Sequence, residues 1–183
     1  MSAVDALIDA GAAFDGNPLG NPDTFRKCLG QFATGVTVIT ANVGGELIGM
    51  TANSFSALSL DPPLILWSVG KASNRGQKFC AATRFAVNIL ASNQVHMSQL
   101  FGSSQLDKFH SIGWSEGRNG APILPGVAAV FECDLETQHS AGDHTVLIGR
   151  VTRAVNFERD GLIFARGRYR HAVDHPAADR PAV

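Results

Sequence analysis

The segment from Thr51 to Pro63 carries the side chains best suited to bind a small polar molecule. It combines small hydroxyls and an amide with backbone donors, and it ends in the stiff turn Asp61-Pro62-Pro63. Such groups suit binding a flat polar ring system better than filling a hydrophobic core. The alternation through Ala52, Ser54 and Ser56 predicts a strand with polar groups in a row on one face. The alternative is an edge strand whose serines face solvent.

One predicted strand later, the chain has the composition of a phosphate-binding helix start, in the residues Lys71-Ala72-Ser73-Asn74-Arg75. Ser73 is the predicted N-cap, so free backbone N–H groups and the positive end of the helix dipole would point out of the loop. Lys71 and Arg75 add full charges beside that end. A capped surface helix with solvated basic residues would have the same composition. The proximity of the ring-binding segment favours a ligand that carries both a polar ring and a phosphate.

Two further clusters are weaker candidates. Gly142-Asp143-His144-Thr145 predicts a tight turn that enters a strand. His144 could contact a ligand there, with Asp143 fixing the imidazole, or it could be an exposed histidine beside a turn-capping aspartate. Arg166-Gly167-Arg168-Tyr169-Arg170 ends the last predicted strand, either as a phosphate contact or as a solvated strand end.

The sequence lacks the motifs of several common catalytic sites. It has no Gly-x-Gly-x-x-Gly after a strand, no Walker loop and no Gly-x-Ser-x-Gly elbow. Cys28, Cys80 and Cys133 are odd in number and widely spaced, which fits neither a disulfide framework nor a zinc site. We therefore expect no metal, and chemistry that rests on an organic cofactor if the protein is an enzyme.

Composition indicates an ordinary globular protein. Of 183 residues, 45% are hydrophobic, and 15 Lys and Arg balance 16 Asp and Glu. This balance gives no general attraction to nucleic acid or to an anionic membrane, although a local basic cluster could still bind phosphate. The apolar run Leu64 to Trp67 is too short to span a membrane. The expected location is the reducing cytoplasm.

The predicted elements are mostly strands. Helices are expected after Asn21-Pro22-Asp23, over residues 73–82 and over residues 94–102. Gly44-Gly45 predicts a hairpin turn, and the strand Leu64 to Val69 is expected to be buried on both faces. Further strands are expected over 36–40, 47–50, 85–90, 128–137, 145–155 and 162–169, with a loop over 113–125. This pattern is typical of a mainly β protein built as a closed or nearly closed antiparallel barrel.

These elements divide the chain into three parts. We expect residues 1–20 to form a flexible or helical arm, 21–172 a single domain and 173–183 a disordered tail.

In their order along the chain, these motifs resemble the short-chain flavin reductases, the reductase partners of two-component flavin-dependent monooxygenases. The resemblance runs from about residue 24 to 170. The matching segments are Phe25-Arg26, Phe32 to Thr40, Gly49-Met50-Thr51-Ala52-Asn53-Ser54-Phe55, Ser59 to Pro63, Lys71-Ala72-Ser73, Phe85 to Leu90, Asp107-Lys108-Phe109, Gly142 to Thr145 and Arg168-Tyr169.

This resemblance implies an FMN-binding split β-barrel of Greek-key type that forms a homodimer, with the flavin near the subunit interface. It places the flavin ring and ribityl chain on Thr51, Ala52, Asn53, Ser54, Phe55 and Ser59. It places the phosphate at Lys71, Ala72, Ser73, Asn74 and Arg75, with Ser103 near the far end of the cofactor. His144 would border the nicotinamide and Tyr169 would line the same pocket.

The implied activity is hydride transfer from NADH or NADPH to FMN or FAD, and reduced flavin would then leave for a separate monooxygenase. No side chain needs to act as an acid or base in such a reaction. Two other functions stay open: a flavin-binding electron carrier of the same fold that cannot use nicotinamide, and a dimeric module that binds RNA through the basic strand end.

Overall fold

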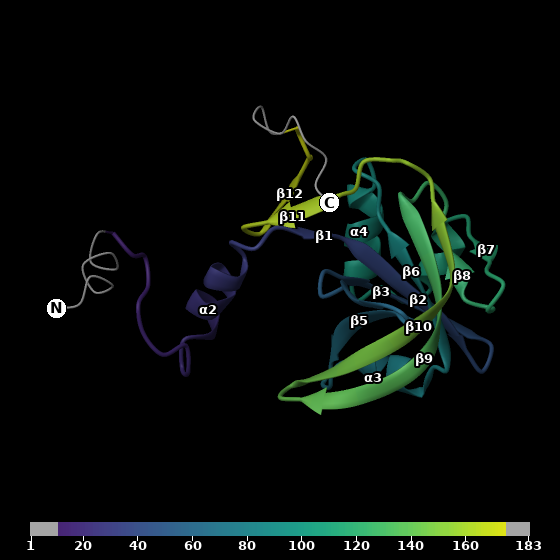
Figure 1. Cartoon of the computed structure of the whole chain (residues 1–183), viewed down its shortest axis with the longest axis horizontal. Helices are drawn as coiled ribbons and strands as arrows, with labels where there is room; N and C mark the ends of the chain where they lie inside the picture. The colour runs from purple at the N-terminus through teal and green to yellow at the C-terminus, as the bar shows by residue number, and fades with distance from the viewer. Residues whose placement is uncertain (1–10, 175–183) are drawn as a thin grey trace.

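The computed structural model describes residues 11–174, which form a mainly β structure (Figure 1). In this range there are three α-helices, α2 (Pro22–Leu29), α3 (Asn74–Ala81) and α4 (Val95–Gly102), and one short 3-10 helix, η1 (Lys108–Ser111). The strands are β1 (Thr34–Gly35), β2 (Thr37–Val43), β3 (Glu46–Ala52), β4 (Ser56–Leu60), β5 (Pro63–Gly70), β6 (Arg84–Ile89), β7 (Ser115–Glu116), β8 (Pro122–Ile123), β9 (Ala129–Ala141), β10 (His144–Asn156), β11 (Ile163–Ala165) and β12 (Arg168–Arg170).

Seven strands form one antiparallel sheet in the order β3-β2-β6-β9-β10-β5-β4. A second sheet has the order β1-β11-β12, and β7 pairs with β8. Within residues 11–174 the large sheet is not closed, because its edge strands β3 and β4 do not pair with each other. The antiparallel, mainly β class is confirmed, whereas the expected closed barrel is not seen.

Local sequence signals explain several of these elements. Gly44 and Gly45 have φ angles of 60° and 89°, so two glycines supply the left-handed turn of the β2–β3 hairpin. Ser73 caps α3 by accepting the N–H of Gly76 at 3.2 Å. The predicted hairpin and the three predicted helices of the described range are confirmed.

Two hydrophobic clusters hold the sheets and helices together. In the first, Trp67 packs edge-to-face against Phe79 of α3 and Phe85 of β6, with ring centroids 5.1 and 5.9 Å apart. The second lies against α4, where Phe101 is fully buried and packs over Gly49 of β3. A Cβ at Gly49 would lie only 2.4 Å from the Phe101 ring, so glycine lets α4 approach β3.

Three predictions about the strands were wrong. Residues 162–169 form no single strand, because Arg166 and Gly167 take positive φ angles and turn β11 into β12. β5 is not buried on both faces: Ile65, Trp67 and Val69 are buried, but the alternate side chains are only half-buried. The predicted loop 113–125 contains the short β7–β8 ladder.

The expected polar row along residues 52–56 was also wrong, because β3 ends at Ala52 and β4 begins at Ser56. The chain bends between them, where the Ser54 hydroxyl bonds to the backbone of Ser68 in β5. A side chain that pairs with a backbone 14 residues away leaves no sign in strand periodicity.

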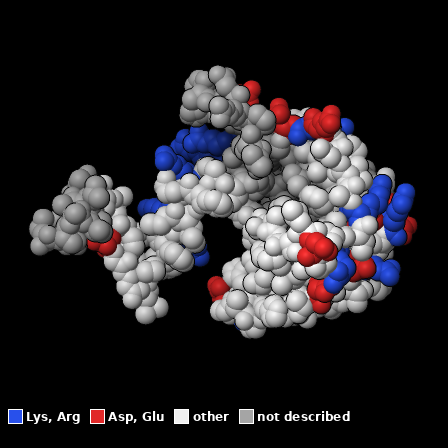
Figure 2. Space-filling view, in the orientation of Figure 1, with Lys and Arg blue, Asp and Glu red and all other residues white. Residues whose placement is uncertain are grey.

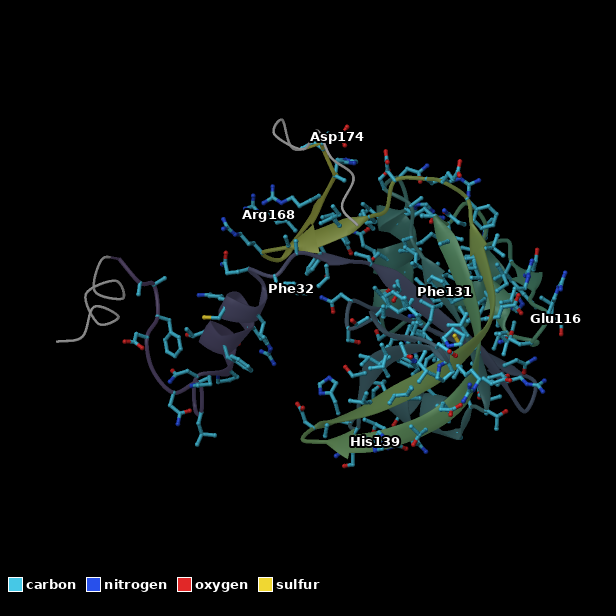
Figure 3. All side chains as sticks on the ribbon, viewed as in Figure 1. Phe32, Glu116, Phe131, His139, Arg168 and Asp174 are labelled. Carbon is cyan, nitrogen blue, oxygen red and sulfur yellow. The ribbon has the colours of Figure 1, made fainter. Side chains whose placement is uncertain are left out.

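A smaller part of the molecule projects from the large sheet. There α2, which has no buried residue, lies beside β11 and β12 (Figure 1). Exposed Lys and Arg residues gather on this projecting part, as Figure 2 shows. In Figure 3, Phe32 and Arg168 lie on this side of the molecule, opposite Glu116. The basic residues are Arg26, Lys27, Arg166, Arg168 and Arg170.

Both ends of the chain carry predictions that the structure does not test. Residues 1–10 of the expected arm and residues 175–183 of the expected tail lie outside the described residues, and residues 11–20 contain no helix. None of the helices in the range 11–174 is long and apolar enough to cross a membrane.

Candidate functional site

The start of α3 presents backbone donors and a cation, as its sequence predicts. The Ser73 hydroxyl accepts the N–H of Gly76 and its carbonyl that of Gln77, whereas the N–H groups of Asn74 and Arg75 have no partner among the described residues. The Arg75 guanidinium donates to the carbonyl oxygens of Ser103, at 2.8 Å, and Gln105, at 3.2 Å. The predicted phosphate-binding segment therefore contacts the residues that follow α4. Among them is Ser103, which was expected near the far end of the cofactor.

Lys108 also contacts this part of the chain, at the corner between the start of α3 and the end of α4. Its ammonium donates to the carbonyl oxygens of Phe101 and Ser103, both at 2.7 Å, and the residue is only 4% exposed. Burial and, to a smaller extent, the charge of Arg75 lower the pKa of Lys108 from 10.5 to about 8. The carbonyl of Ser103 thus accepts from two cations.

A cavity of about 350 Å³ opens at this corner, a volume typical of small-molecule sites. Its wall brings together the start of α3, one end of β3 and the chain after α4. Its lining includes Glu46, Gly49, Asn74, Arg75, Lys78 and Lys108.

The predicted ring-binding segment borders a second cavity, of about 190 Å³. Thr51 and Asn53 line it together with Ser98 of α4 and Tyr169 of β12. The hydroxyl of Thr51 donates to the Ser98 carbonyl at 2.7 Å, and the hydroxyls of Ser98 and Tyr169 lie 3.0 Å apart. Asn53 is exposed and its side chain has no hydrogen-bond partner among the described residues, so it is available to a ligand.

The same helix contacts both halves of the predicted site. Thr51 bonds to the carbonyl of Ser98, and Arg75 bonds to the carbonyl of Ser103, the C-cap of the same helix. Five residues of α-helix span about 7.5 Å along the axis. The segments predicted for a polar ring and for a phosphate are thus held by one short helix.

Other predicted site residues have structural partners. The hydroxyl of Ser54 accepts the N–H of Ser68 at 3.0 Å and donates to its carbonyl at 3.1 Å. The ring of Phe55 stacks on Phe131, with centroids 5.9 Å apart, and Ala52 belongs to the first core cluster. The side chains of these three residues therefore contact other parts of the chain.

Ser59 lies on β4, opposite Leu64 of β5, and lines neither cavity. Ala72 is exposed in the turn before Ser73.

Lys71 and His144 lie at the tip of the β9–β10 hairpin. The ammonium of Lys71 donates to the Ser140 hydroxyl at 2.7 Å and to the Gly142 carbonyl at 2.5 Å. His144 Nδ1 lies 2.7 Å from the Asp143 carboxylate, and this hydrogen bond lowers the pKa of Asp143. The His144 side chain is 48% exposed and lines neither cavity. The structure therefore does not bring His144 and Tyr169 into one cavity of this chain.

Sequence reasoning did not single out Ser98 or Lys108 by their chemistry. Ser98 lies within a mostly apolar helix and nothing in its spacing marks it. Lys108 occurs in one of the matching segments, Asp107-Lys108-Phe109, which gave it no role. Their value to the site comes from contacts between distant parts of the chain.

The described residues hold no group of three or more His, Cys, Asp or Glu side chains that could bind a metal ion. The arrangement found instead can bind a ring, orient it and hold a phosphate.

Comparisons with known proteins identify the family of the chain. Residues 29–172 match the model of the flavin reductase like domain. The chain is 44% identical over 149 residues to the FMN reductase (NADH) SmoA of Agrobacterium fabrum, a match that covers 81% of this chain and 85% of that protein. It is 43% identical over 150 residues to HsaB of Rhodococcus jostii, the reductase subunit of a flavin-dependent monooxygenase, covering 81% and 77%.

A solved structure is also similar. The NADH:FAD oxidoreductase SgcE6 of Streptomyces globisporus, in complex with NAD and FAD fragments, has a TM-score of 0.84 at 38% identity and covers 91% of this chain and 100% of that chain. Some relatives are longer than this chain. For four of them, which are 43–45% identical to it, the match covers between 48% and 85% of their length. The family predicted from the motifs is confirmed: the chain belongs to the flavin reductase like domain family.

Proposed function

We propose that the protein is an NADH-dependent flavin reductase that supplies reduced flavin to a separate monooxygenase. The observation that carries this proposal is the attachment of Thr51 and Arg75 to one helix, α4, through the carbonyls of Ser98 and Ser103. It connects the segment proposed to bind the ring with the segment proposed to bind the phosphate, which supports one cofactor that contacts both. The activities of SmoA and SgcE6 support the same substrates.

The residues present fit a flavin. The unpartnered N–H groups of Asn74 and Arg75 suit its phosphate, and the unpartnered Asn53 amide suits its polar ring. Thr51 and the backbone of residues 52–55 would hold the ring edge and ribityl chain, with Lys71, Ala72 and Ser73 beside the phosphate and Ser59 at the periphery. Flavin, once bound, accepts hydride directly from a reduced nicotinamide.

The protein's own part is to bind and orient. Tyr169 is held by Ser98 beside Thr51 and Asn53, where it would restrict the position of the nicotinamide. His144, with its imidazole held by Asp143, would border the nicotinamide from the hairpin tip. Neither residue needs to exchange a proton, because the hydride passes between two rings brought into contact.

An exposed apolar face on α2 supports a homodimer. Phe25, Leu29 and Phe32 form one face of α2 and the turn after it, and they are 45%, 57% and 77% exposed. A second copy that covers this face would bury it and could bring the partner's hairpin toward the cavity of Thr51 and Tyr169. We also propose that residues 21–172 form one domain with a split-barrel fold. The protein would be cytoplasmic and would accept NADPH as well as NADH.

A second candidate function is a flavin-binding electron carrier that does not use nicotinamide. The position of His144 outside both cavities favours it. Purified protein mixed with NADH or NADPH and with FMN or FAD separates the two functions. Turnover with at least one pair supports the reductase, whereas flavin binding without any nicotinamide oxidation supports the carrier.

A further inference from the structure

A cavity of about 310 Å³ lies on the side of the molecule that carries β7 and β8. Within the described residues it shares no lining residue with the two cavities of the proposed flavin site. Figure 2 shows basic and acidic side chains close together on this side. The lining comes from β6, β9, β10 and the turn between β7 and β8, and it includes Arg84, Arg118, Asn119, Glu132, Asp134 and Arg153. We call this cavity the Arg118 pocket.

A β-bulge in β10 explains why two neighbouring residues line this pocket. The register between β10 and β9 shifts between Val151 and Arg153, so Thr152 is one residue extra in the ladder. In a regular strand, neighbouring side chains point to opposite faces. The bulge instead brings Thr152 and Arg153 to the same cavity. The irregularity of the strand thus adds a guanidinium to the pocket.

A buried carboxylate holds the pocket in shape. Glu132 is only 1% exposed, and its carboxylate accepts from the Arg153 guanidinium at 2.6 Å and from the backbone N–H of Asn119 at 2.9 Å. The side-chain amide of Asn119 donates to the Phe85 carbonyl at 3.0 Å. The turn that carries Arg118 is therefore fixed to β6 and β9, and its backbone needs little rearrangement to receive a ligand.

The pocket carries one positive charge without a counterion. Arg153 pairs with Glu132, and Arg84 lies 3.4 Å from the second carboxylate, that of Asp134. Arg118 is exposed and has neither a hydrogen bond nor an ion pair with another described residue. Three guanidiniums thus meet two carboxylates in the lining. Arg153 uses only Nη1 for its bond to Glu132, so further N–H donors of this side chain stay open to a ligand.

We propose that the Arg118 pocket binds a small organic monocarboxylate, whose oxygens accept hydrogen bonds from Arg118 and Arg153. A guanidinium can hold a carboxylate through two parallel N–H···O bonds that match its planar geometry. A monoanion balances the single uncompensated charge, whereas Glu132 and Asp134 in the same lining would repel a phosphate dianion. The volume is at the small end for ligand sites, which favours an acid of few carbon atoms. Such binding is independent of the proposed flavin chemistry.

NMR titration of the intact, isotope-labelled protein with propionate tests this site. At constant ionic strength, propionate should shift the backbone amide signals of residues 117–121 and 152–153 saturably, with a Kd in about the millimolar range. Propionamide, a neutral molecule of the same shape, should leave these signals in place. Inorganic phosphate should bind at least about fivefold more weakly than propionate. Shifts that do not saturate, equal shifts with propionamide, or phosphate binding as tight as that of propionate would each overturn the proposal.

Two variants assign the binding to Arg118. Arg118→Gln should weaken propionate binding about fivefold or more, because it removes the charge and the planar fork that the carboxylate uses. Arg170→Gln is the matched control, since Arg170 is also exposed, has no partner among the described residues and lies outside the pocket. Its Kd for propionate should stay within about twofold of the unmodified protein. Thermal melting confirms the fold of each variant, and equal propionate affinities of the two variants would contradict the proposal.

Discussion

Thr51 and Arg75 belong to different elements, yet both donate hydrogen bonds to carbonyl oxygens of α4 and its C-cap. Thr51 bonds to Ser98 at 2.7 Å and Arg75 to Ser103 at 2.8 Å. Because those carbonyls belong to one short helix and its cap, a shift of α4 would move both halves of the proposed flavin site together.

Replacing Arg75 by lysine should weaken flavin binding. A guanidinium can donate to the carbonyls of Ser103 and Gln105 at once, whereas an ammonium at the same position cannot reproduce that fork. The loss of one charge-assisted hydrogen bond predicts a rise of about tenfold or more in the Kd for flavin. Calorimetry with FMN measures it. Arg84→Lys is the control, since Arg84 lies on β6 and pairs with Asp134. Equal affinities of both variants would rule out this role of Arg75.

Asn53 and Ser54 should differ in what their loss affects. Asn53→Ala removes an exposed amide without a partner among the described residues, so it should raise the Kd for flavin about 2- to 10-fold and leave the melting temperature unchanged. Ser54→Ala removes both hydrogen bonds to Ser68 and should reduce the free energy of unfolding by about 1–3 kcal/mol. Flavin titration and thermal melting of each variant measure the two effects. Loss of stability on the Asn53 change would mean that this amide has a structural role.

His144→Ala should separate nicotinamide use from flavin affinity. We expect kcat/KM for NADH to fall about tenfold or more while the Kd for flavin stays within about twofold. Steady-state kinetics with NADH as the varied substrate measures the first and titration the second. Asp143→Asn should show a smaller loss, because the imidazole keeps a hydrogen-bond partner. A variant that loses flavin affinity first would place His144 at the flavin instead.

Lys108 should make flavin binding and stability depend on pH near 8. An anionic phosphate nearby favours the charged lysine, so the Kd for flavin should rise as pH increases above the pKa of about 8. The folded state holds this proton less tightly than the unfolded state, whose lysine has its ordinary pKa of 10.5. The free energy of unfolding should therefore rise with pH between 8 and 10.5 on account of this group.

Lys108→Met should abolish both trends, as measured by flavin titration and by urea unfolding at several pH values. Lys27→Met, a change at an exposed lysine of α2, should leave both in place. A Kd that is independent of pH in the unmodified protein would show that Lys108 does not sense the bound phosphate.

What could be predicted from the sequence was mostly local. Ser73 acts within its own helix turn and Gly44-Gly45 within its own hairpin, so neighbouring residues were enough to indicate both. The bend at Ser54 depends on Ser68, and the corner at Ser103 depends on Lys108 and Arg75. Such contacts form only when distant segments pack, so the periodicity of the sequence does not predict them. The order of the short motifs was what connected the segments to one family before their geometry was known.

Anaerobic mixing of the purified protein with NADH and either FMN or FAD tests the proposed reductase activity directly. We expect the flavin to be reduced as NADH is consumed in equal amounts, and Arg75→Lys to slow this at low flavin concentration while Arg84→Lys does not. Flavin that binds but stays oxidised with both NADH and NADPH would contradict the account.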